Sequence, residues 1–312
     1  GARGLPQPSP HLRERGSRPP GGAMKFRARF GNASQLSKLV QTLDKVGDHC
    51  FVHLTPDNVS FAVVGDAGDG VQVWADMTRA SLFLDHRCES RNNNQISFTT
   101  KVSNLVRALR SACANSNVQT VVKLTKKTGI PTFSFEIQQP QTQLKITHDV
   151  PIRLVLDDDE LLRSYEPTLP DEYMNISASV VLPGSELRSL QNVVERMGSF
   201  ATYMVVDITN APSGHVLRLQ VEKENLMNMT TTFSKLASAV QEDPSVSKTA
   251  EAKVEVKKLG RVLRSLLSTD LKVSQLICCI VPGHTVVLKC YFDNQDDKNT
   301  IVYYLPVHFL EP

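Results

Sequence analysis

Apolar and polar residues alternate along residues 24–30, a pattern that predicts a half-buried β-strand. A stripe of leucine and valine at helical spacing follows over 34–47, where Ser34 can cap the start of a helix and Gly47 its end. Three strand-like runs come next, at 50–54, 59–64 and 71–76. The pattern therefore predicts a unit of one strand, one helix and three strands.

The same β-α-β-β-β order recurs three more times, with first strands opening at positions 95, 174 and 251. Helices are expected at 101–115, 185–198 and 257–268. The remaining strands are expected at 118–125, 132–137, 144–150, 203–208, 216–221, 227–233, 275–281, 285–292 and 300–305. We therefore predict an α+β fold of four units, arranged as two equivalent domains with mostly antiparallel sheets.

Two segments of unusual composition divide the chain. Residues 1–23 hold five Pro, five Gly and four Arg, so we expect a disordered leader whose deletion leaves stability unchanged. Residues 151–172 contain four consecutive acids at 157–160, which suits a connector. The predicted domains are then 24–150 and 173–312. Apolar runs are short and broken by charge, so we expect no membrane span.

The predicted helices are strongly basic although the whole chain has a formal net charge of only +3. They carry eleven Lys and Arg but only three acids. Solvated helices usually mix both signs, because pairs of opposite charge four residues apart are stabilising. The surplus favours helices that face phosphates without reading bases, with ordinary solvated helices as the alternative. The eleven cations are Lys38, Lys45, Lys101, Arg107, Arg110, Arg188, Arg196, Lys257, Lys258, Arg261 and Arg264.

No standard nucleotide, zinc or nucleophile motif occurs in the sequence. The six cysteines lack the spacing of a zinc site, so we expect reduced thiols, no metal and no cofactor. The acidic run 157–160 leaves a metal-dependent nuclease as an alternative, although carboxylates in one linker are usually solvated. We predict a protein that is not an enzyme.

Three stretches carry a resemblance to a known family: Met24-Lys-Phe-Arg-Ala28, Ile146-Thr-His-Asp-Val-Pro-Ile152 and Val302-Tyr-Tyr-Leu-Pro306. From Met24 onward the chain resembles the sliding-clamp family. Within that family it most resembles the hydroxyurea-sensitivity subunits of the nine-one-one DNA-damage checkpoint clamp. The resemblance implies helices inside a ring and antiparallel sheets outside it. It also implies a nuclear subunit that is partly cytoplasmic when unassembled.

The resemblance further implies partners for the chain. These are two related clamp subunits in a heterotrimer, a clamp-loader ATPase, double-stranded DNA without sequence preference, and checkpoint mediators with repair enzymes. In the family, the last strand of the first domain pairs with the third strand of a neighbour's second domain. The matching interface residues are Leu144, Ile146, His148 and Val150 on one edge, and Met227, Met229, Thr231 and Phe233 on the other.

The replicative homotrimeric clamp is the alternative within the family. Such clamps are strongly acidic and have a hydrophobic connector and an acidic C-terminal tail. This chain is slightly basic, has an acidic connector and ends Leu310-Glu-Pro312. These departures favour the checkpoint clamp over the replicative one.

Overall fold

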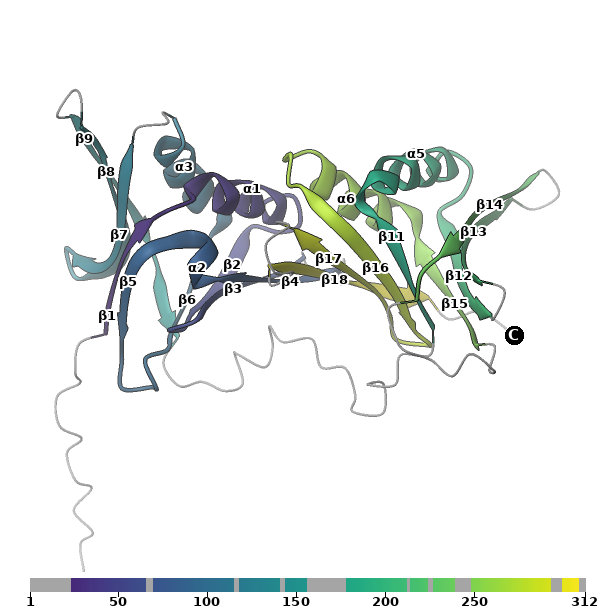
Figure 1. Ribbon diagram of the computed structural model, residues 1–312, viewed down its shortest axis with the longest axis horizontal. Coiled ribbons are helices and arrows are strands. Elements are labelled where there is room, and N and C mark those ends of the chain that lie inside the picture. The colour runs from purple at the N-terminus through teal and green to yellow at the C-terminus, as the bar shows by residue number, and fades with distance from the viewer. Residues whose placement is uncertain are drawn as a thin grey trace, which may run out of the picture.

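The computed structural model describes residues 24–65, 70–114, 118–140, 144–155, 178–211, 214–223, 227–238, 248–292 and 299–308. The predicted leader 1–23 and the acidic run 157–160 lie outside the described residues, as does the connector from residue 156 to 172. Figure 1 shows the described elements as a row of helices on one side of several sheets. No helix in these ranges is long and apolar enough to cross a lipid bilayer.

Four β-α-β-β-β units are present in the predicted order. The first contains β1 (Lys25–Phe30), α1 (Ala33–Leu43), β2 (His49–Leu54), β3 (Asn58–Val64) and β4 (Gln72–Thr78). The second contains β6 (Ile96–Lys101), α3 (Val102–Ala112), β7 (Gln119–Lys127), β8 (Ile130–Gln139) and β9 (Leu144–Pro151). The third contains β11 (Ala178–Pro183), α5 (Leu187–Gly198), β12 (Tyr203–Ala211), β13 (Gly214–Lys223) and β14 (Met227–Leu236). The fourth contains β15 (Lys248–Glu255), α6 (Val256–Leu267), β16 (Val273–Val281), β17 (Thr285–Phe292) and β18 (Thr300–His308).

Three further elements lie outside this repeat and were not predicted: α2 (Arg79–Leu82), β5 (Phe83–Glu89) and β10 (Arg153–Val155). In the third unit, the first two residues of the helix predicted at 185–198 belong to the 3-10 turn η2 (Gly184–Glu186). Strand β5 pairs along the whole of β1, but only its Phe83 is buried, so its hydrophobic pattern is weak. Strand β10 pairs with β6, so residues 153–155 belong to a sheet rather than to the connector in which they were predicted.

The first helix differs from its prediction at both ends. Its N-cap is Asn32, whose side chain accepts a 3.1 Å hydrogen bond from the N–H of Gln35, so Ser34 is not the cap. The helix ends at Leu43 because a tight turn then returns the buried side chain of Val46 to the core. Gly47 has no positive φ; a Cβ there would lie 2.8 Å from the carbonyl oxygen of Val64. Glycine at 47 therefore permits close packing against β3 and does not end the helix.

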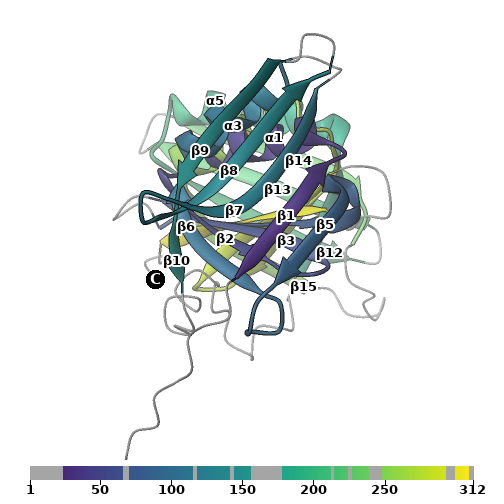
Figure 2. The ribbon, with the colours of Figure 1, turned by 90° about the vertical axis from the view of Figure 1, so that its left-hand side faces the viewer.

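The strands form sheets that run across the whole chain. One sheet has the order β5-β1-β7-β8-β9, and Figure 2 shows it from the outside with β9 at one border. A larger sheet runs β10-β6-β2-β3-β4-β18 and continues from β18 through β17 and β16 to β11. Strand β18 also meets β15 at two residues, which connects the row β15-β12-β13-β14.

The two halves of the chain are joined where β4 pairs with β18. Five residue pairs connect these strands, from Asp76 with Thr300 to Gln72 with Tyr304. The buried side chain of Asn299 extends the join, since its Oδ1 accepts hydrogen bonds from the N–H of Thr78 at 2.9 Å and from Ser81 Oγ at 3.2 Å. The halves therefore share one continuous sheet.

The long helices lie side by side in the order α3, α1, α6, α5 on one side of the sheets (Figure 1). Each packs an apolar stripe against the strands, such as Leu36, Leu39, Val40 and Leu43 on α1. At the middle of the row, Thr42 Oγ1 lies 2.7 Å from Thr269 Oγ1, which connects α1 to the turn after α6. We call the exposed side of these four helices the helix face.

Gly184 and Gly260 form a matched test of backbone packing. A Cβ on Gly184 would lie 2.0 Å from the carbonyl oxygen of Val273, whereas one on Gly260 would lie 3.6 Å from Val194 Cγ1. We expect Gly184→Ala to lower the free energy of unfolding by about 1–3 kcal/mol through overpacking. Gly260→Ala should preserve or raise it, because alanine favours the helix by about 1 kcal/mol. Urea denaturation measures both, and equal effects would contradict the packing described.

Candidate nucleic-acid interface

The eleven predicted cations gather on the helix face. Nine lie within α1, α3, α5 and α6. The other two adjoin helices, and for them the predicted helical placement is wrong: Lys45 lies in the turn after α1, and Lys101 is the last residue of β6 and the N-cap of α3. Eight of the eleven side chains are exposed, while Lys38, Lys258 and Arg261 are partly buried.

Three of these cations have an acidic partner within the chain. Lys38 Nζ lies 3.3 Å from Asp270 Oδ2, Lys258 Nζ lies 3.4 Å from Glu255 Oε2, and Arg264 Nε lies 3.4 Å from Glu195 Oε1. Seven others form no ion pair with any residue that the structure describes. These seven are Lys45, Lys101, Arg107, Arg110, Arg188, Arg196 and Lys257.

Cations on the sheets are arranged differently, because many face an acid on the neighbouring strand. Arg29 Nη2 lies 2.9 Å from Asp85 Oδ2, and Lys123 Nζ lies 2.5 Å from Glu136 Oε1. The hydrogen bond from Lys123 is the main cause that lowers the pKa of the Glu136 carboxyl. The sheets thus neutralise much of their own charge, whereas most cations of the helix face have no acidic partner among the described residues.

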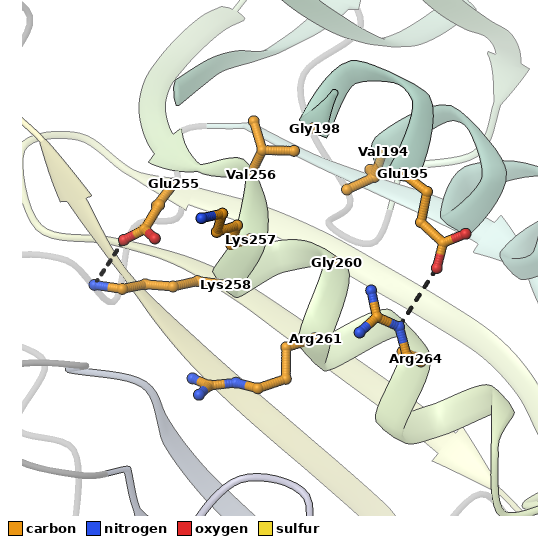
Figure 3. Close-up of a pocket in the computed structure, with 10 residues that line it drawn as sticks. All are labelled: Val194, Glu195, Gly198, Glu255, Val256, Lys257, Lys258, Gly260, Arg261 and Arg264. Carbon is orange, nitrogen blue, oxygen red and sulfur yellow. Dashed lines mark hydrogen bonds and ion pairs between the residues drawn. The ribbon is translucent and has the colours of Figure 1, made fainter. Parts of the chain in front are cut away.

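A groove of about 700 Å³ separates α5 from α6 on the helix face (Figure 3). Its charged lining residues are Glu195, Glu255, Lys257, Lys258, Arg261 and Arg264. Figure 3 shows the two ion pairs of this set as dashed lines, one between Lys258 and Glu255 and one between Arg264 and Glu195. The first turn of α6 contains two lysines, and its N-cap residue Glu255 places an acid at the positive end of the helix dipole.

The predicted interface residues occupy the two terminal strands, β9 and β14, which lie at opposite ends of the molecule (Figure 1). Among the described residues, β9 pairs only with β8 and β14 pairs only with β13. Leu144 and Ile146 are 51% and 39% exposed, whereas Val150 is buried in the core of the chain. His148, Met229, Thr231 and Phe233 are partly buried, and the side chain of Met227 lies outside the described residues.

The thiols do not form a reactive site. Burial raises the pKa of Cys88 and Cys279 to about 11 and raises those of Cys50, Cys278 and Cys290 further, so these thiols stay protonated near neutral pH. All six cysteines are free. Within the described ranges, no group of three His, Cys, Asp or Glu side chains is placed to hold a metal.

The acidic partners on the helix face were not predicted from the sequence. Asp270 lies 232 residues from Lys38, and Glu195 lies 69 residues from Arg264. Neither pair can therefore be recognised from residues that are close together in the sequence. Glu255 could have been found, because it stands three residues before Lys258 at the start of a helix.

Comparison with solved structures defines the class of fold. PCNA from Thermococcus kodakaraensis superposes with a TM-score of 0.61 at 16% identity, over 91% of this chain and 100% of that one. The chain has the PCNA-like sliding-clamp fold, as predicted.

The sequence comparisons define the family. A family model described as Hus1-like protein matches residues 24–308. The checkpoint protein hus1 homolog of Dictyostelium discoideum is 31% identical over 286 residues, which cover 91% of this chain and 98% of that protein. Checkpoint protein hus1 of Schizosaccharomyces pombe is 28% identical over 299 residues, with 91% and 99% covered. The chain belongs to the Hus1-like protein family, and the prediction of a hydroxyurea-sensitivity checkpoint subunit is confirmed.

Glu195→Gln tests the charge of the helix face. The substitution removes the acidic partner of Arg264, so the variant should elute from a heparin column at higher salt than the parent chain. Its free energy of unfolding should change by less than about 0.5 kcal/mol, because the pair is exposed. Glu222→Gln on β13 is the control, since it removes the same charge from an exposed sheet position. Equal shifts for both variants would show that the helix face is not the polyanion-binding surface.

Proposed function

We propose that this chain is one third of a heterotrimeric ring that encircles double-stranded DNA, with its helix face toward the duplex. In this proposal two related subunits complete the ring, and a clamp-loader ATPase places it on damaged or stalled DNA in the nucleus. The chain acts there without catalysis, as a platform for checkpoint mediators and repair enzymes. Contacts to phosphates alone give no sequence preference.

The observation that carries the proposal is the row of helices α3, α1, α6 and α5 with its unpaired cations. Seven exposed Lys and Arg in these helices or next to their ends have no acidic partner in the described residues. A duplex carries a phosphate charge about every 1.7 Å of its axis, so a line of exposed cations can bind it at any sequence.

The symmetry of the sheets supports ring closure. Strands β4 and β18 are the last strands of the first and fourth units, and they pair within the chain. Strands β9 and β14 are the last strands of the second and third units, and each has a free edge among the described strands. Free edges readily pair with another chain. If β9 and β14 pair with neighbouring subunits as β4 pairs with β18, each chain takes part in two further joins of the same kind, and each of these joins is shared with a neighbour.

The two free edges differ in charge. Strand β14 has only Lys235 as a charged residue, whereas β9 carries Lys145 and Asp149. Lys127 lies 3.2 Å from Asp149, and Ser134 Oγ donates a 2.7 Å hydrogen bond to its other carboxylate oxygen. A homotrimer would require these two edges to complement one another. The Hus1-like family assignment also favours the checkpoint clamp over the replicative homotrimer.

Charge reversal on the helix face tests the orientation toward DNA. We expect the assembled ring with Glu at 107, 110, 188 and 196 to bind linear duplex at least about tenfold more weakly at physiological salt. A single reversal should change little, because each contact is exposed and screened. The control places Glu at Lys25, Arg27, Arg87 and Arg218, four exposed cations on the sheets. Unchanged binding by the first variant would refute the orientation.

Proline substitution in β14 tests the subunit contact. Successive N–H groups of an antiparallel strand point alternately to the neighbouring strand and to the free edge. One of Thr230→Pro and Thr231→Pro therefore removes an edge donor, and the other removes a donor to β13. The edge variant should keep its thermal stability and lose one partner subunit in a pull-down while keeping the other. If both partners stay bound to whichever variant remains folded, the interface lies elsewhere.

A further inference from the structure

Two helices on the helix face repeat one another residue by residue. Val102–Ser111 and Val256–Ser265 are identical at six of ten positions, which are two leucines, two arginines, the first valine and the last serine. Both helices follow a strand without a break. The N–H of Val102 donates to the carbonyl of Asp48, and that of Val256 to the carbonyl of Thr202, both at 2.9 Å. Helices α3 and α6 are therefore structural equivalents.

The other two helices repeat in the same way. The turns that end them form the same backbone hydrogen bonds, since Val46 and Gly47 donate to the carbonyl of Leu43 as Phe200 and Ala201 donate to that of Met197. In this register Leu36, Val40 and Leu43 align with Leu190, Val194 and Met197, and all six side chains are buried. Helices α1 and α5 are the second pair of equivalents.

This alignment divides the eleven cations into two sets. The repeated set is cationic in both halves and consists of the pairs Arg107 with Arg261 and Arg110 with Arg264. The unrepeated set consists of Lys38, Lys45, Lys101, Arg188, Arg196, Lys257 and Lys258, whose counterparts are Asn192, Ser199, Glu255, Ser34, Thr42, Ser103 and Asn104. Lys101 aligns with Glu255, so a cation at this position is not common to the two halves.

From these two sets we infer that the repeated cations are the phosphate contacts of this subunit and that the unrepeated ones are not. This inference rests on the proposed function. A duplex presents phosphates at regular intervals, so equivalent units around it meet the backbone in equivalent ways. A contact used by both halves must then come from a position that is cationic in both.

The repeated arginines are placed unfavourably for the helices that carry them. Arg107 and Arg110 stand three residues apart on one helix face, as do Arg261 and Arg264, and such like-charged neighbours disfavour a helix. Glu195 partly compensates the second pair through its contact with Arg264. The first pair has no acidic partner among the described residues, and an external anion would compensate it.

Two double variants of equal charge test the inference in the assembled ring. Arg107 and Arg110 to Gln removes two repeated cations, and Arg188 and Arg196 to Gln removes two unrepeated ones. All four side chains are exposed and form no ion pair with a described residue. Binding to linear duplex is measured across a series of salt concentrations, and thermal unfolding confirms that both variants are folded.

The slope of log affinity against log salt should fall by about 0.9 for each phosphate that the variant no longer neutralises. We expect that fall for the variant of Arg107 and Arg110 and an unchanged slope for the variant of Arg188 and Arg196. Equal decreases of the slope in both variants would overturn the inference, because the two sets of cations would then contribute equally to phosphate binding. That result would leave the proposed function standing. An unchanged slope in both would overturn the proposed function as well.

Discussion

The join between β4 and β18 is the interaction on which the arrangement of the molecule depends. It makes one sheet of the two halves and fixes their relative position through five backbone pairs and the buried side chain of Asn299. Because the halves are held this way, α1 and α6 meet at the centre and all four helices form one row. The join pairs β4 and β18, the last strands of the first and fourth units. The last strands of the second and third units, β9 and β14, therefore remain at the ends of the molecule. Both the helix face and the free edges follow from it.

Charged residues are distributed differently on the sheets and on the helices. On the sheets, cross-strand neighbours bring opposite charges together, as with Arg29 and Asp85 or Lys123 and Glu136. On the helices, the apolar stripe must face the sheets, so the remaining polar positions all point to the helix face. Those positions hold few acids, and the protein carries a cationic surface that its own folding does not require.

The sequence predicted the repeat, because period-two and helical patterns alternate clearly in all four units. It also located the cationic face, since exposed helix positions are identifiable from the apolar stripe. It missed β5, where Phe83 is the only buried side chain, and it extended the first helix to Gly47, where glycine serves packing against Val64. It could not predict that Lys38 pairs with Asp270, because that contact depends on the join between the halves.

The central claim is that the helix face meets DNA while the outer side of the sheets does not, and site-specific crosslinking tests it most directly. A photoactivatable residue is placed at Ser189 on α5, or at Lys25 on β1, both exposed positions. The ring is then assembled with its two partner subunits and loaded on duplex DNA. The account predicts crosslinks to DNA from position 189 and none from position 25. Crosslinks from position 25 without any from position 189 would contradict it.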